Sequence, residues 1–217
     1  MLTTQFEHVP ETSLTVLALG AHADDIEIGC GGTLLRLARA YPELDVHWIV
    51  LSGNGTRAEE ARASATSFLE GVERRRIVTE AFRDGFFPYL GGAVKDFFEQ
   101  LKAEVEPDLI LTHARHDLHQ DHRLVSDLTW NTFRNHLILE YEIPKYDGDM
   151  GAPNFFVQLD EETCDAKISK IISHFSSQRD RRWFTEDLFR SLLRLRGMES
   201  NSPGGHAEAF YSRKLVW

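Results

Sequence analysis

Residues 14–25, with the sequence LTVLALGAHADD, decide the fold, because an apolar run passes directly into a turn that carries His22, Asp24 and Asp25. A short apolar run that ends at a turn is typical of a buried strand. After the glycine-rich segment 29–32, residues 33–40 space their leucines for a helix that is buried on one face. The chain therefore opens with a strand, a polar loop and a helix.

The same alternation continues along the first half of the chain. We expect further strands at residues 46–51, 76–82 and 108–112, and helices at residues 59–71 and 93–105. Alternating strands and helices predict an α/β fold with a doubly wound, mostly parallel sheet flanked by helices, a Rossmann-like arrangement. Ligands in such folds bind beyond the carboxyl ends of the strands, which is where residues 21–25 lie.

The second half of the chain is less regular. We expect strands at residues 137–143, 154–159 and 210–216, and helices at residues 161–175 and 185–195. Residues 1–217 are interpreted as a single domain, with an α/β core in residues 1–135 and a small C-terminal elaboration in residues 136–217 that completes the site. The loop 144–153 follows a strand and is expected to contribute to the rim of the site.

Charge and composition limit the kinds of binding partner and compartment that we expect for this protein. The net charge of −10 disfavours nonspecific binding to nucleic acid or to an anionic membrane surface. Only two cysteines, Cys30 and Cys164, fit a reducing compartment rather than a disulfide framework. Residues 1–13 are too polar for a signal peptide, and no stretch approaches the roughly 18 apolar residues of a membrane span. We expect a soluble cytoplasmic protein without a membrane anchor, and a homo-oligomer is compatible with the sequence.

Two clusters carry residue types that bind metals. The turn holds His22, Asp24 and Asp25, and the segment His119-Gln120-Asp121-His122 follows the fourth expected strand. A catalytic zinc ion takes three protein ligands from imidazole and carboxylate groups and keeps a position for water. His22, Asp25 and His122 supply such a set, and Asp24 remains as a base for water whose pKa falls to about 7 beside the metal.

His119 and Asp121 complete the expected catalytic group. If this segment is helical, His119 lies one turn before His122, so one imidazole binds metal while the other faces substrate as an acid or oxyanion stabiliser. We expect Asp121 to orient His119 through a hydrogen bond. We interpret His113, at a strand end, as a histidine packed near the site rather than as a ligand.

These motifs also resemble a known family. Residues 17–25 with the glycines of 29–32 look like the first motif of the PIG-L/LmbE zinc-dependent N-acetylglucosaminide deacetylases, and residues 119–122 resemble their second motif. The likeness extends to residues 52–57 with Glu60, 84–85 and 205–210. The family usually has Pro at the positions of Ala23 and Gln120, and often Glu at that of Ile26, but none of these three carries an assigned role.

The resemblance implies a function. It implies a metal-dependent hydrolase that removes the N-acetyl group from a small amino sugar or glycoconjugate, with Arg57 and Asp84 holding sugar hydroxyls. The implied cofactor is Zn2+, although a nitrogen and oxygen ligand set also accepts Fe2+ or Co2+.

Two alternatives fit the same residues. His22-Ala23-Asp24 with distant His122 matches the His-x-Asp…His pattern of non-haem iron oxygenases, although those sites usually lie on all-β scaffolds. The other alternative is a non-catalytic sugar-binding homologue, in which a ligand or the base would be expected to be missing. The three expected ligands and the expected base are all present in this sequence.

Overall fold

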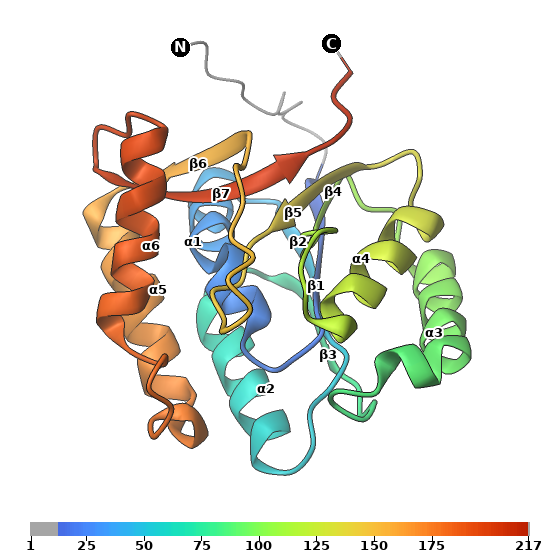
Figure 1. The fold of residues 1–217 in the computed structure, drawn as a ribbon. Coiled ribbons are helices and arrows are strands. Elements are labelled where there is room, and N and C mark those ends of the chain that lie inside the picture. Colours follow the sequence, from blue (N-terminus) through green and yellow to red (C-terminus); the bar gives the residue numbers. More distant parts are fainter. Residues whose placement is uncertain (1–12, 217) are drawn as a thin grey trace.

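The computed structural model describes residues 13–216, and its centre is a seven-stranded sheet in the order β3-β2-β1-β4-β5-β7-β6 (Figure 1). Five strands are parallel, which confirms the predicted doubly wound α/β fold: β1 (Thr15–Gly20), β2 (Asp45–Val50), β3 (Arg74–Thr79), β4 (Leu109–His113) and β5 (Leu137–Tyr141). The expectation about a signal peptide in residues 1–13 falls almost wholly on residues 1–12, which lie outside the described residues.

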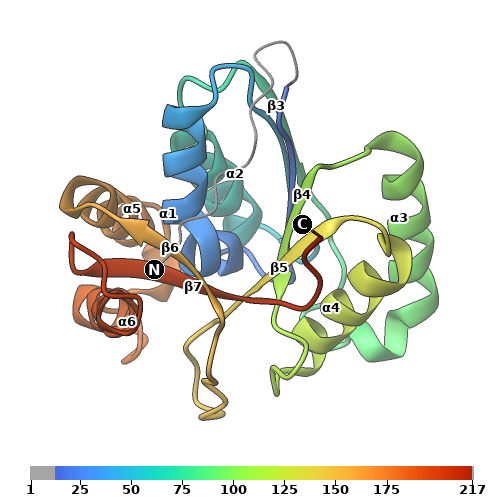
Figure 2. The same cartoon turned by 90° about the horizontal axis from the view of Figure 1, so that it is seen from above.

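Helices cover both faces of this sheet, as Figure 2 shows from above. On one face lie α1 (Asp25–Ala40) and α2 (Thr56–Phe68), and on the other lie α3 (Gly91–Glu104) and α4 (Gln120–Thr132). Each layer has its own buried apolar cluster, because alternate side chains of the buried strands face opposite helices. Within residues 13–216, no helix combines the length and apolar character needed to cross a membrane.

The C-terminal elaboration adds two antiparallel strands and two helices. They are β6 (Phe155–Leu159), α5 (Glu161–His174), α6 (Glu186–Glu199) and β7 (His206–Ser212), and β7 lies between β5 and β6. The predicted bounds of the last strand, 210–216, are wrong. Residues 206–209 alternate polar and small side chains and so give no apolar signal, yet they pair with β6 through a full register.

The helix α1 begins earlier than the predicted residues 33–40, because the glycine-rich segment is helical rather than a loop. These glycines let the helix approach the sheet closely. A Cβ on Gly29 would overlap the Tyr141 ring, and one on Gly32 would lie 2.6 Å from Leu159. The helix bends at Cys30, whose φ of −145° is not helical. Close packing, rather than a turn, explains the glycines here.

A buried ion pair ties the elaboration to this helix. Glu208 of β7 accepts hydrogen bonds from the backbone of Gly32 and Thr33, each at 2.7 Å, and from Lys167 of α5 at 2.6 Å. Both charged side chains are almost completely buried, so each charge needs the other. The C-terminal elements therefore fix the helix that follows the first motif.

A second buried acid in α1 gives a prediction about pH and stability. Glu27 is fully buried, and burial raises its pKa from 4.5 to about 8, against a smaller opposing effect of the Ser64 hydroxyl. An unfolded glutamate ionises near pH 4.5, so the folded protein should lose stability between that pH and about 8. The variant Glu27→Gln should lack this loss, which is on the order of a few kcal/mol.

Thermal unfolding of both proteins from pH 4 to 9 checks this expectation. The difference in free energy of unfolding between Glu27→Gln and the wild type should grow with pH and level off above about 8. Glu106→Gln, at an exposed surface position, serves as the control and should give a flat difference. A flat difference for Glu27→Gln would contradict the prediction.

Candidate metal centre

The first part of the site is the turn between β1 and α1. The N–H of His22 donates to Oδ2 of Asp25 at 2.6 Å, and Nδ1 of the His22 ring lies 3.3 Å from the same oxygen. The N–H of Ala21 donates to Nε2 of His113, the last residue of β4, at 3.0 Å. His113 is therefore a fully buried strand-end residue that braces the turn.

The second part of the site opens α4. His119 caps the helix, because its Nδ1 accepts the N–H of Asp121 at 3.3 Å. His122 lies in the first turn and is only 2% exposed. The rings of His119 and His122 are 4.5 Å apart between centroids. The helical segment thus places a half-exposed and a buried imidazole next to each other.

The two parts converge on one point. Nδ1 of His22 lies 3.0 Å from Nε2 of His122, and Oδ2 of Asp25 lies 3.3 Å from the first nitrogen and 3.5 Å from the second. A tetrahedral zinc ion with bonds of about 2.0–2.1 Å separates its ligand atoms by about 3.4 Å. The three side chains predicted as ligands therefore fit a single divalent ion in spacing and in chemistry.

The charges around these atoms also suit a cation. Burial opposes ionisation of Asp25, but the imidazoles of His122, His113 and His22 outweigh it and hold the pKa of Asp25 well below its usual range. Burial, with a contribution from His113, lowers the pKa of His122 to about 4, so this ring is neutral and keeps a lone pair. A metal ligand must be an ionised carboxylate or a neutral imidazole, and Asp25 and His122 already favour these forms.

His22 differs from His122, because its surroundings favour a positive charge on the ring. Burial disfavours a charge on this ring, but the carboxylates of Asp25, Asp121 and Asp84 outweigh burial and raise the pKa of His22 well above its usual value. These carboxylates favour a positive charge at this spot, whether it is carried by a proton or by a metal ion.

Asp117 is a residue of the site that the sequence interpretation missed. Its Oδ2 accepts a hydrogen bond from Nδ1 of His122 at 2.9 Å, and its Oδ1 accepts the N–H of His119 at 2.8 Å. Burial opposes its ionisation, but the hydrogen bonds from His122 and Lys145 hold the pKa of Asp117 well below its usual range. The spacing Asp117-Leu118-His119, in which an aspartate bonds the N–H two residues on, is the signal that was available.

Asp121 makes different contacts from those predicted. Its Oδ2 accepts the N–H of Gly85 at 2.6 Å and lies 3.3 Å from Nε2 of His22, while its Oδ1 accepts the N–H of Phe87 at 3.1 Å. The expectation that this carboxylate orients His119 is therefore wrong. Asp121 points into the protein from the first turn of α4, where it fixes the loop 84–87 and contacts the His22 ring instead.

Asp24 stands beside the ligands and is paired with Arg57. Nη2 of Arg57 donates to Oδ1 of Asp24 at 2.8 Å, and Nη1 of Arg57 lies 3.4 Å from Glu60. Glu60 is itself held by the N–H of Ser177 at 2.8 Å. Burial raises the pKa of Asp24, and the Arg57 charge limits that rise. The predicted base is thus a buried carboxylate with a fixed guanidinium beside it.

Asp84 and His119 border the same space. Oδ1 of Asp84 lies 3.1 Å from Nε2 of His22, although the Asp84 side chain is 76% exposed. Burial and the neighbouring His22 charge lower the pKa of His119, so its ring is neutral near pH 7. Because Nδ1 of His119 accepts a hydrogen bond, the proton of the neutral ring resides on Nε2.

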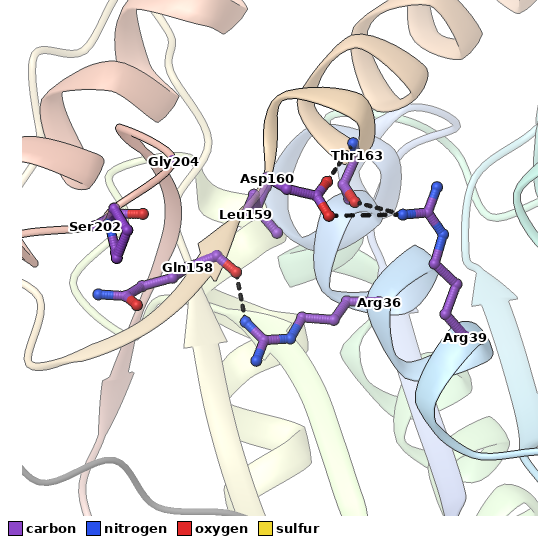
Figure 3. A pocket seen from close by; sticks show the side chains of 9 residues that line it. Arg36, Arg39, Gln158, Leu159, Asp160, Thr163, Ser202 and Gly204 are labelled. Atoms are coloured by element: carbon purple, nitrogen blue, oxygen red, sulfur yellow. Dashed lines mark hydrogen bonds and ion pairs between the residues drawn. The ribbon is translucent and has the colours of Figure 1, made fainter.

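An open pocket of about 360 Å3 lies away from these residues, between the end of α1, the end of β6 and the start of α5 (Figure 3). Its two arginines are already bonded within the protein. Arg36 donates to the carbonyl of Gln158 at 2.5 Å, and Arg39 donates to Thr163 at 3.1 Å and to Glu162 at 2.8 Å. The residues that line this pocket include no set of metal ligands comparable to the cluster at His22.

Comparison with known proteins places this geometry in a family. The family model described as PIG-L: GlcNAc-PI de-N-acetylase matches residues 17–133, which include both motifs. The deacetylase YaiS of Escherichia coli (strain K12), described as uncharacterized, is 30% identical over 171 residues, which are 74% of this chain and 90% of YaiS.

Solved structures share the fold. The N,N'-diacetylchitobiose deacetylase of Pyrococcus horikoshii superposes with a TM-score of 0.68 at 21% identity, over 91% of this chain and 83% of that one. The 4-carboxy-2-hydroxymuconate hydratase GalB of Pseudomonas putida KT2440 superposes with a TM-score of 0.67 at 16% identity, over 94% and 98%. Because a deacetylase and a hydratase share this fold, the fold alone does not assign the reaction. The family model covers more than half of the chain and the matched YaiS region covers most of it, so the chain belongs to the PIG-L family of de-N-acetylases.

Proposed function

We propose that this N-deacetylase hydrolyses the acetamide of an amino sugar of the N-acetylglucosamine type, alone or within a glycoconjugate, with the help of a bound zinc ion. One observation carries the proposal. Two imidazole nitrogens and a carboxylate oxygen lie 3.0–3.5 Å from one another, next to the separate buried carboxylate of Asp24. An ion held by His22, Asp25 and His122 would polarise the acetamide carbonyl and activate a water molecule beside it.

In this proposal Asp24 is the general base. It takes a proton from the water as the oxygen of that water bonds to the carbonyl carbon. His119, neutral and with its proton on Nε2, donates a hydrogen bond to the oxyanion that forms. Asp24 then returns its proton to the nitrogen as the C–N bond breaks, and acetate and a free amine leave.

The two alternative functions are less well supported. An iron oxygenase would need Asp24 as a ligand, but Asp24 is bonded to Arg57, and the scaffold is α/β rather than all-β. A non-catalytic homologue would be expected to lack part of the machinery. His22, Asp25, His122 and Asp24 are all present and adjacent.

Acetate release tests the proposed function. We expect the zinc-loaded protein to liberate acetate and a primary amine in equal amounts from at least one member of a panel of free, nucleotide-linked and oligomeric N-acetylhexosamines. N-propionyl and N-formyl analogues of the best substrate would define the acyl group. A folded protein that binds zinc but releases no acetate from the whole panel would favour the non-catalytic alternative.

Arg57 provides a sharper test of the base. Its charge opposes the rise in the pKa of Asp24, so Arg57→Gln should raise that pKa further. Because the base must be ionised, the acid-side limb of the kcat/KM profile should move to higher pH. Arg115→Gln, in an exposed ion pair with Asp127, is the control. A raised KM with an unchanged profile would instead assign Arg57 to sugar binding.

A further inference from the structure

The loop between β5 and β6 returns to the metal centre through Lys145. This loop, which spans residues 142–154, projects from the sheet between α6 and α4 (Figure 1). Nζ of Lys145 lies 2.9 Å from Oδ2 of Asp117, 2.5 Å from Oδ2 of Asp149 and 3.3 Å from the carbonyl of Ile143. The side chain is only 13% exposed, so these contacts are shielded from water.

Asp117 joins this ammonium to the proposed ligands. The same Oδ2 that contacts Lys145 accepts the hydrogen bond from Nδ1 of His122, and Oδ1 accepts the N–H of His119. Asp149 reaches the same segment, because it accepts the N–H of Leu118 at 2.7 Å. One cation of the loop therefore lies between two carboxylates that hold the segment 117–122 in place.

Further contacts anchor the far end of the loop. The carbonyl of Gly151 accepts a hydrogen bond from Arg196 at 3.1 Å, and Arg196 donates from Nε and Nη2 to the buried Glu142. A Cβ on Gly151 would overlap the Tyr211 hydroxyl, so the loop packs directly against β7. The loop that carries Lys145 is thus fixed at both ends, so the backbone as well as the side-chain contacts holds Lys145 in place.

We propose that Lys145 is a positioning residue of the metal centre: it holds Asp117 so that His122 keeps its proton on Nδ1 and presents Nε2 to the ion. The inference rests on the proposed function, in which His122 is a ligand. A histidine ligand usually donates its second N–H to a carboxylate, which fixes the tautomer and the ring plane. Here the carboxylate itself is held by a cation from a distant loop.

A direct catalytic role for Lys145 fits the contacts less well. An ammonium group has three N–H donors, and Asp117, Asp149 and the Ile143 carbonyl supply three acceptors. No donor is left for a substrate. The Lys145 ammonium also balances the charges of Asp117 and Asp149. Its removal should therefore disturb the segment 117–122 rather than a step of the reaction itself.

Zinc affinity of the metal-free protein tests the proposal without reference to activity. Competition with a chromophoric chelator gives the Kd for Zn2+ alone. We expect Lys145→Met to bind Zn2+ about 10- to 100-fold more weakly than the wild type. Lys145→Arg keeps the charge and should lose less. Lys170→Met, which removes a half-buried lysine bonded to Ser67, should bind Zn2+ like the wild type.

A double-mutant cycle separates positioning from general destabilisation. Asp117→Asn should weaken Zn2+ binding by itself, and adding Lys145→Met to it should cause little further loss, because the lysine acts through Asp117. If Lys145→Met does not fold, Lys145→Gln takes its place in the same cycle. Wild-type Zn2+ affinity in the folded Lys145 variants, or additive losses in the cycle, would overturn the proposal.

The outcome is also separable from that of the proposed function. A protein that releases no acetate from any N-acetyl sugar can still show the loss of Zn2+ affinity in Lys145→Met, and the positioning role then stands. Conversely, if the wild type releases acetate and Lys145→Met binds Zn2+ like the wild type, the proposed function stands and the positioning role of Lys145 is refuted.

Discussion

Asp24→Asn should keep the zinc ion and lose most of the activity. Asparagine has the same shape, and its carbonyl oxygen can still accept the hydrogen bond that Arg57 donates to Asp24 at 2.8 Å. It cannot take a proton from water. General-base catalysis contributes typically 10²- to 10⁴-fold, so kcat should fall by about that factor. Acetate release under saturating substrate, together with the metal content of each protein, measures both halves of the expectation.

The control for this variant removes a carboxylate elsewhere. Asp127→Asn breaks an exposed ion pair with Arg115 and should leave kcat unchanged. Near wild-type turnover in Asp24→Asn would refute the assignment of the base. Loss of zinc from that variant would instead make Asp24 a ligand and would revive the His-x-Asp…His pattern at His22 and His122.

The buried strands are the part of the fold that the sequence predicts best. β1, β2 and β4 are short apolar runs, and each is covered by helices on both faces, so pattern and environment agree. β3 is harder to predict. It begins at Arg74 with three arginines in a row, which resemble a solvated helix end, but it pairs with β2 along its whole length at the edge of the sheet. The apolar residues after Arg76 predict a strand at 76–82, but only the backbone pairing with β2 shows that the strand begins at Arg74.

The site divides in a similar way. The convergence of His22, Asp25 and His122 can be predicted, because their side chains are typical metal ligands and they follow strands whose carboxyl ends meet. Lys145 is a single charged residue without a motif, and its contact with Asp117 emerges only when the loop after β5 is seen beside the loop after β4. Contacts between loops depend on the three-dimensional fold, so the supporting residues of the site escape prediction.

Replacement of a ligand should have a larger effect on metal binding than any of the supporting changes. His122→Ala removes Nε2, which lies 3.0 Å from Nδ1 of His22, and leaves only two of the three proposed ligands. The loss of Zn2+ affinity should exceed the roughly 10- to 100-fold that loss of an outer contact costs. Acetate release should then be undetectable at one equivalent of zinc. Metal analysis after dialysis, with His136→Ala as a control at a half-buried histidine beside Phe133, tests this expectation.

The contradicting outcome for His122→Ala is informative because the structure contains a competing group. His22, Asp84 and Asp121 also bring three donor atoms within 4.8 Å of one another. If an ion bound there, His122→Ala would retain stoichiometric zinc, whereas Asp84→Ala would lose it. Asp84 argues against that site, because its side chain is 76% exposed, whereas Asp25 and His122 are almost completely buried. The pair of variants therefore distinguishes the two positions for the ion, and we expect only the His122 variant to lose it.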